Sequence, residues 1–490
     1  MKKWSQFFLA GIMFLGVWIF GGVQAEASVP VDEANFPDAA VRAYAQSIDK
    51  DKNGVLSDQE LRTPTYFSFG LKREIEKFGA NPSTVINFKG MEQFVNIKDV
   101  SLYDVGTGSE KWNYSDSNLL RYFPYATHIK METNFTASSG MGGKISLTGT
   151  SAYLQELEII TPGILKWDVK AKNLKKLVIQ YADISNSGFS LAGFPSLKKL
   201  TFGYANLRNS GLSLQGLSSL EFINLVGSHY NELDLSPVRK TLKTLSIGDH
   251  WEADDTDTPD EGSSYLKTLD ISQMEKLENV WAGYTGITKL ITRDSQGKAK
   301  TKKIKELYMT GCKIKSIDVT AMPALEKLYL RNTSLSKLNV SKNKNLKELS
   351  VSSQKIKSIN LKKNIKLDTL VLGGKIKSLD LSKNTSLRAL RLNIGKLKKL
   401  KLPMPKKSIK WSAKNKNFVS GYLGGRTAYK ATVLDLSEYK KITQKARNYQ
   451  IRILKRCGIK KIIIRKNLKK TDKNWVEKKV RKVKARLVVK

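Results

Sequence analysis

The chain of 490 residues has few of the residues that build most catalytic and cross-linked sites. Its two cysteines, Cys312 and Cys457, lie far apart in the sequence and exclude a disulfide framework. Its three histidines, His128, His229 and His250, have neither metal-ligand spacing nor a convincing set of catalytic partners. No glycine-rich phosphate loop follows a predicted strand. These absences argue against an enzyme and leave a carboxylate-based active site as the enzymatic alternative.

Long apolar runs are absent beyond the N-terminus. Residues 1–27 combine two early lysines, an apolar run over 7–23 and a small-x-small triplet at 25–27. This order predicts a signal peptide over 1–27 and therefore a secreted protein. The run is about 17 residues long, so an uncleaved membrane anchor is the alternative. No later stretch is apolar enough to cross a membrane.

Acidic residues are scarce in the C-terminal part of the chain. Residues 1–300 contain 32 of the 85 Lys and Arg and 34 of the 44 Asp and Glu. The segment 301–490 therefore contains 53 basic and only 10 acidic side chains, so the whole net charge of +41 lies there. Solubility alone does not require this imbalance, which indicates a polyanionic partner. The alternative is a basic face that only contacts solvent.

The sequence is rich in one feature, a short leucine-rich motif that recurs at nearly constant intervals. The motif L-x-x-L-x-(L/I/V) starts at Ile304, Leu325, Leu346, Leu367 and Leu387, and successive start numbers differ by 21, 21, 21 and 20. Looser copies start at Leu154, Leu174, Leu197, Leu220, Leu242 and Leu277, and degenerate copies at Ile97 and Ala126. Burying six aliphatic side chains stabilises one repeat by roughly 10–15 kcal/mol, whereas ordering its backbone costs at least about 20 kcal/mol. One repeat is therefore unstable alone, and the repeats must stack into an array.

This pattern predicts an α/β fold of the leucine-rich-repeat solenoid type, with a curved parallel β-sheet. We assign the solenoid to residues 88–402 and a small helical N-terminal cap to 28–87. Residues 403–490 leave the repeat and are predicted to form a basic α/β C-terminal cap, because the open end of such an array needs cover.

The N-terminal segment contains a twelve-residue loop, Asp49-Lys50-Asp51-Lys52-Asn53-Gly54-Val55-Leu56-Ser57-Asp58-Gln59-Glu60, that matches the EF-hand pattern. Gly54 permits the sharp turn, and Glu60 supplies a bidentate carboxylate. The sequence therefore predicts one calcium ion. The expected ligands are Asp49, Asp51, Asn53, the carbonyl of Val55, Ser57 and Glu60. The alternative is a polar turn between two helices.

Several units resemble the repeats of secreted bacterial surface proteins. They are LDISQMEKL (269–277), IDVTAMPAL (317–325), LNVSKNKNL (338–346) and LDLSKNTSL (379–387). The segment ANFPDAAVRAYAQSIDKDKNGVLSDQE (34–60) is similar to the N-terminal cap that often precedes such arrays. The resemblance is distant to the internalin-type adhesins. It implies a secreted or cell-surface binding protein and no particular ligand.

Aromatic residues are predicted to gather on the concave face. The fifth residue of each repeat motif points away from the core, which places Trp281, Tyr308 and Tyr329 in consecutive strands. The eighth position adds Tyr181, Tyr204 and Tyr284. Exposed aromatic residues in a concavity are typical interface anchors and also stack on sugar rings. The alternative is that these rings only pack on one another.

Lysines recur at two positions of the basic repeats. The first column contains Lys313, Lys355, Lys375 and Lys396, and the second contains Lys315, Lys357, Lys377 and Lys398. Stacked repeats would place neighbouring members about 5 Å apart. Like charges at this distance repel, and a polyanion would relieve the repulsion.

These observations favour a secreted, non-enzymatic protein retained at the bacterial cell surface. Its concave face would bind a protein or glycan ligand, and its basic third would bind anionic wall polymer or another polyanion. Export makes nucleic acid only an incidental partner. The alternatives are a structural envelope component without a discrete ligand and a polymer-degrading enzyme. The acidic insertion at 249–265 is either a solvated loop or a second cation site that includes His250.

Overall fold

The protein is described by a computed structural model. The residues described are 28–70, 87–103, 119–132, 145–160, 165–185, 188–208, 212–248, 266–387, 389–394, 399–401, 433–436, 461–464, 466, 468, 470–482 and 485–489. The expected signal peptide at 1–27 and the acidic insertion at 249–265 lie outside these residues. Within the described residues, no helix is both long enough and apolar enough to span a membrane.

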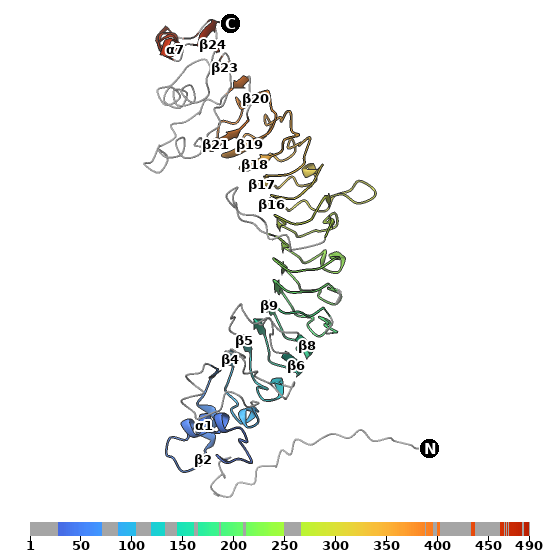
Figure 1. Ribbon diagram of the computed structural model, residues 1–490, viewed down its shortest axis with the longest axis vertical. Coiled ribbons are helices and arrows are strands. Elements are labelled where there is room, and N and C mark those ends of the chain that lie inside the picture. The colour runs from blue at the N-terminus through green and yellow to red at the C-terminus, as the bar shows by residue number, and fades with distance from the viewer. Residues whose placement is uncertain are drawn as a thin grey trace, which may run out of the picture.

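The protein forms an elongated, curved solenoid with a long parallel sheet on its concave side (Figure 1). In the described part of the chain this sheet has fourteen strands. They are β3 (Tyr66–Phe69), β4 (Asp99–Tyr103), β5 (His128–Glu132), β7 (Glu156–Ile160), β9 (Lys176–Gln180), β10 (Lys199–Gly203), β11 (Phe222–Asn224), β12 (Thr244–Ser246), β14 (Asn279–Trp281), β16 (Glu306–Tyr308), β17 (Lys327–Leu330), β18 (Glu348–Ser352), β19 (Thr369–Gly373) and β21 (Ala389–Asn393). The strands follow one another in chain order, as the solenoid prediction required.

Shorter elements form the opposite side of the solenoid. β6 (Ile145–Thr150) pairs with β8 (Leu165–Lys170), and β13 (Thr268–Asp270) pairs with β15 (Lys289–Ile291). Four 3-10 turns are described, namely η1 (Met91–Gln93), η2 (Leu119–Arg121), η3 (Ser236–Val238) and η4 (Val319–Ala321). A second parallel sheet contains β20 (Ser378–Asp380), β22 (Lys399–Lys401), β23 (Val433–Leu436), β24 (Lys461–Ile464) and β25 (Arg486–Val489), with α7 (Lys470–Lys482) before its last strand.

The core consists of the apolar positions of the repeat. In one basic repeat, Leu346, Leu349, Val351 and Ile356 are all fully buried. The strand residues between them point outward, so each strand covers the core on one side and forms the concave surface on the other.

The N-terminal segment combines two helices with the first strand of the long sheet. α1 (Ala39–Ile48) begins at Asp38, whose side chain accepts hydrogen bonds from two backbone amides of the first turn. α2 (Asp58–Arg62) begins with a capping box between Ser57 and Glu60. β3 lies within 28–87, so the repeat sheet begins inside the segment that the sequence assigned to the cap.

Candidate functional site

The predicted calcium loop lies between α1 and α2. Its centre forms β2 (Val55–Leu56), which pairs antiparallel with β1 (Val29–Pro30). Gly54 has φ +80°, a left-handed conformation that glycine adopts without strain. No other atom lies within 4 Å of a Cβ built there, so the backbone angle alone requires glycine. The turn and its anchoring strand therefore agree with the sequence expectation.

Three carboxylates of this loop meet at one place. Oxygen atoms of Asp49, Asp51 and Glu60 all lie within 4.8 Å of one another. Asp49 is buried, with 7% of its surface exposed, and its Oδ2 accepts a 2.8 Å hydrogen bond from the Gly54 amide. Amides of Ser57 and Lys50 donate to Glu60 at 3.0 and 2.8 Å and lower the pKa of its carboxyl group.

These three carboxyl groups lie close together, an arrangement that a hard cation stabilises. The remaining expected ligands lie on the same loop. Asn53 uses its Oδ1 to accept from the Val55 amide at 2.8 Å, and the Ser57 hydroxyl donates to Glu60 at 2.8 Å. All the donors are oxygen atoms, so the residues present fit calcium.

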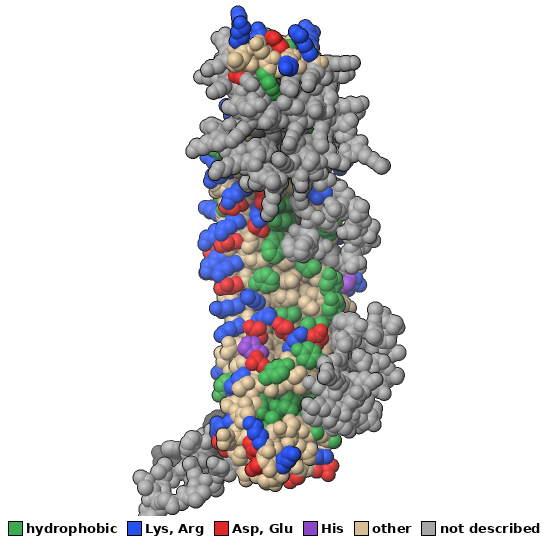
Figure 2. Space-filling model, turned by 90° about the vertical axis from the view of Figure 1, so that its left-hand side faces the viewer, with side chains coloured by type: hydrophobic (Ala, Val, Ile, Leu, Met, Phe, Trp, Pro, Cys, Tyr) green, Lys and Arg blue, Asp and Glu red, His purple; other side chains and the backbone are tan. Residues whose placement is uncertain are grey.

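The fifth positions of the repeats form one unbroken row on the concave sheet, as the spacing predicted. Each member is directly paired with the next in the strand register. The row is Glu158, Val178, Thr201, Asn224, Ser246, Trp281, Tyr308, Tyr329, Ser350, Val371 and Arg391. Apolar side chains are visible along the centre of this face (Figure 2).

The predicted aromatic ladder is present, but its members differ in exposure. The rings of Tyr308 and Tyr329 stack with centroids 4.3 Å apart and planes 8° apart. Tyr329 is only 8% exposed, and its hydroxyl donates to the carboxylate of Glu348. Burial raises the pKa of the Tyr308 phenol. Tyr329 is therefore a packed residue and lacks the exposure that we expected of an anchor, whereas Trp281 is partly exposed.

The eighth-position tyrosines lie in a different environment. Tyr181, Tyr204 and Tyr284 have φ values of +63°, +52° and +57°, a conformation that costs roughly 1–2 kcal/mol for a residue with a side chain. Tyr181 and Tyr204 are 41% and 53% exposed. Their rings stack, with centroids 5.4 Å apart and planes 8° apart.

The repeats that follow Tyr204 and Tyr284 have a glycine at this position. A Cβ at Gly227 would lie 2.4 Å from the Tyr204 ring, and a Cβ at Gly311 would lie 2.6 Å from the Tyr284 ring. Each tyrosine ring therefore occupies the space that a neighbouring side chain would need. Exposed residues in a strained conformation are most common at functional sites.

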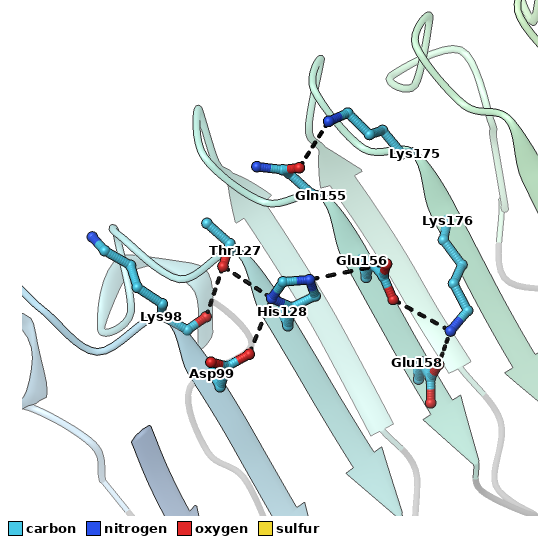
Figure 3. Close-up of polar contacts among 9 residues, drawn as sticks. All are labelled: Lys98, Asp99, Thr127, His128, Gln155, Glu156, Glu158, Lys175 and Lys176. Carbon is cyan, nitrogen blue, oxygen red and sulfur yellow. Dashed lines mark hydrogen bonds and ion pairs between the residues drawn. The ribbon is translucent and has the colours of Figure 1, made fainter. Parts of the chain in front are cut away.

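A charged network crosses the N-terminal part of the concave face (Figure 3). His128 Nδ1 lies 3.0 Å from Asp99 Oδ1, and its Nε2 lies 3.9 Å from Glu156 Oε1. Lys176 Nζ lies 3.3 Å from Glu156 Oε2 and also binds Glu158. We did not predict this network, although the third positions of successive strands would have revealed it, because Asp99, His128, Glu156 and Lys176 are direct register partners.

A second set of ion pairs follows one edge of the sheet. Lys243 Nζ lies 2.8 Å from Glu221, Lys305 Nζ 2.7 Å from Glu278, and Lys347 Nζ 2.6 Å from Glu326. In each pair the lysine and the glutamate occupy the same position in successive repeats. We call this set the ion ladder. Basic and acidic side chains alternate along this edge (Figure 2).

The predicted lysine columns are exposed but interrupted. Six of the predicted lysines are exposed and form no ion pair with another described residue, namely Lys313, Lys315, Lys355, Lys357, Lys375 and Lys377. Ser334 and Ser336 occupy the two positions in the intervening repeat. The spacing of one repeat therefore applies only to the lysines after residue 350. Lys396 and Lys398 lie outside the described residues.

The strand register and the repeat spacing together define a leucine-rich-repeat solenoid. Neither a protein-family model nor a curated protein sequence matches the chain. Among solved structures, the chain is similar to the functional domain of InlJ from Listeria monocytogenes, with 15% identity, a TM-score of 0.44 and coverage of 86% of this chain and 85% of that one.

A leucine-rich-repeat protein of Leptospira interrogans matches with 16% identity and a TM-score of 0.42, over 86% of this chain and 99% of that one. The ectodomain of the Arabidopsis thaliana receptor kinase GASSHO1/SCHENGEN3, in complex with CASPARIAN STRIP INTEGRITY FACTOR 2, matches with 13% identity and a TM-score of 0.35. That match covers 78% of this chain and 49% of the receptor. Our fold assignment rests on the register of this chain's own strands.

Proposed function

We propose that the protein is a secreted bacterial binding protein whose concave face engages a protein partner. The observation that carries this proposal is the exposed, stacked pair Tyr181–Tyr204, whose backbone is strained at both residues. Asn332 has the same left-handed conformation, so the fold accepts a small polar residue at this position. Two tyrosines therefore incur strain that asparagine or glycine would reduce, which is explained if their rings contact a ligand.

A protein partner fits this pair better than a glycan. Sugar rings stack on open aromatic faces, whereas each of these rings has one face against the other ring. Both side chains still keep exposed surface, because Tyr181 and Tyr204 are 41% and 53% exposed. Tyrosines that offer both apolar and hydrogen-bonding contacts are common at protein interfaces.

The experiment begins with a pull-down by the purified repeat protein against wall fractions and host-cell extracts. A captured protein is identified, purified and titrated against the wild type and a Tyr181→Asn/Tyr204→Asn variant. Tyr153→Asn is the matched control, because Tyr153 is also exposed, at 52%, and lies in a different part of the repeat. Equal affinity of the wild type and the double variant would contradict the proposal.

A second element of the proposal is one calcium ion in the N-terminal loop. Asp49, Asp51, Asn53, Ser57 and Glu60 would bind it through side-chain oxygens, together with the carbonyl of Val55. The support is the cluster of three carboxylates within 4.8 Å. Its role would be to stabilise the cap at the start of the sheet, because β2 of the loop pairs with β1.

A third element is retention at the cell surface through a polyanion such as anionic wall polymer. The support is the composition of the segment 301–490, with 53 basic and 10 acidic side chains. Binding through counter-ion release should weaken steeply with salt. Retention of the purified protein on isolated cell wall that resists moderate salt would contradict this element.

A further inference from the structure

Three buried asparagines connect successive repeats in the turns that precede strands β18, β19 and β21 of the concave sheet. Asn343, Asn364 and Asn384 are fully buried. The side-chain amide of Asn364 donates to the backbone oxygens of Val340 and Asn343 at 2.9 and 2.8 Å. Asn343 and Asn384 make the equivalent two bonds to the repeats before them, at 2.7–2.9 Å. We call these residues the asparagine ladder.

A lysine precedes each residue of this ladder. Lys342, Lys363 and Lys383 are all exposed. Each asparagine bonds to the main chain of the preceding repeat, so the three lysines occupy equivalent places in three consecutive repeats. Hydrogen-bonded neighbouring segments lie about 5 Å apart. The lysine column on the asparagine ladder is therefore continuous, unlike the two columns interrupted by Ser334 and Ser336.

The same repeats place charge differently at two nearby positions, the residue before each ladder asparagine and the residue of the ion ladder. At the ion ladder, each lysine has a glutamate in the preceding repeat, for example Lys347 beside Glu326 at 2.6 Å. Lys342, Lys363 and Lys383 make no ion pair with another described residue. Unit charges about 5 Å apart in water repel by about 0.8 kcal/mol. The chain thus alternates charge along the ion ladder, whereas the residue before each ladder asparagine is a lysine in all three repeats.

We propose that Lys342, Lys363 and Lys383 form the contact surface for a linear polyanion that carries phosphate groups and lies along the long axis of the solenoid. This inference rests on the proposed retention by a polyanion and assigns the site. A linear polymer can meet all three lysines at once, because they lie in one line at nearly constant spacing. The asparagine ladder orders the backbone before binding, which reduces the entropy lost when the polymer binds.

The test uses long-chain inorganic polyphosphate as the probe and the full-length protein. The column variant carries Lys342→Gln, Lys363→Gln and Lys383→Gln. The matched control carries Lys313→Gln, Lys355→Gln and Lys375→Gln, which removes the same charge from an interrupted column. Affinity is measured by titration at several salt concentrations, and thermal melting checks that both variants fold.

We expect the column variant to lose at least about tenfold in affinity near physiological salt and the control to lose less than about threefold. Three lost phosphate contacts should reduce the slope of log affinity against log salt by about 2. Equal losses in both variants would show that only overall charge matters and would overturn the assigned column, while retention by a polyanion would stand. Unchanged affinity in the column variant would also overturn it. If the wild type fails to bind polyphosphate, the retention proposal fails together with this inference.

Discussion

Replacing Tyr181 and Tyr204 by asparagine should separate binding from stability. Each ring buries about half of roughly 200 Å², so its removal costs about 2.5 kcal/mol at about 25 cal/mol per Å². Asparagine tolerates positive φ, which returns roughly 1–2 kcal/mol of backbone strain. The two contributions nearly cancel. Each substitution should therefore lower the free energy of unfolding by no more than about 1.5 kcal/mol.

Thermal melting and titration of the purified partner measure the two effects separately. At about 2.1 cal/mol/K per residue, a loss of about 1 kcal/mol corresponds to a melting shift of only about 1 °C in a chain of 490 residues. Loss of two central aromatic anchors should weaken binding by about 2 kcal/mol or more, which is at least about thirtyfold. The double variant should melt no more than about 3 °C lower, and a shift beyond about 6 °C together with intact binding would refute the reasoning and make the pair a packing feature. The Tyr153→Asn control should change neither quantity strongly.

Three further outcomes follow from the described contacts. Calorimetry should detect calcium binding with a dissociation constant of about 10⁻⁴–10⁻³ M, and Glu60→Gln should abolish the heat. Because the pKa of the Glu60 carboxyl group is lowered, calcium binding should persist in mild acid and disappear as the pH falls through that lowered pKa. Asn364→Ala removes two hydrogen bonds from backbone oxygens that each keep one amide donor, so chemical denaturation should show a loss of about 1–3 kcal/mol, and a loss below about 0.5 kcal/mol would contradict the importance of the asparagine ladder. Gly227→Ala should lower the melting temperature more in the wild type than in Tyr204→Asn, because the new Cβ would lie 2.4 Å from the Tyr204 ring, and equal losses in the two backgrounds would contradict this contact.

The sequence predicted the strand register because the repeat spacing determines which residues are neighbours. The position of Tyr308 beside Tyr329 follows directly from the interval between their repeats. Exposure is not determined in this way, because it depends on where neighbouring side chains point. Tyr329 is covered by the stacked ring of Tyr308 and a bond to Glu348, and neither contact can be read from the period.

Other features were present in the sequence but required alignment in three dimensions. The lysine columns appeared continuous until Ser334 and Ser336 were placed in the same register. Asn343 was visible in the unit LNVSKNKNL, but its role depends on two backbone oxygens of the preceding repeat. Tyrosine itself does not predict the left-handed backbone at Tyr204, but Gly227, Gly311 and Asn332 at the same repeat position are residues that favour it.

The order of charges in the ion ladder repeats only every second unit of the solenoid. Backbone hydrogen bonds connect Lys305, Glu326, Lys347 and Asp368 in this order. The amide of each of the last three donates to the carbonyl oxygen of the preceding member of this series. Basic and acidic residues therefore alternate with a period of two repeats. Removal of residues 326–346 would set Lys347 beside Lys305, whereas removal of 326–367 would set Asp368 there. Adding or removing an even number of repeats therefore preserves the alternation of basic and acidic residues, whereas an odd number places two residues of like charge side by side.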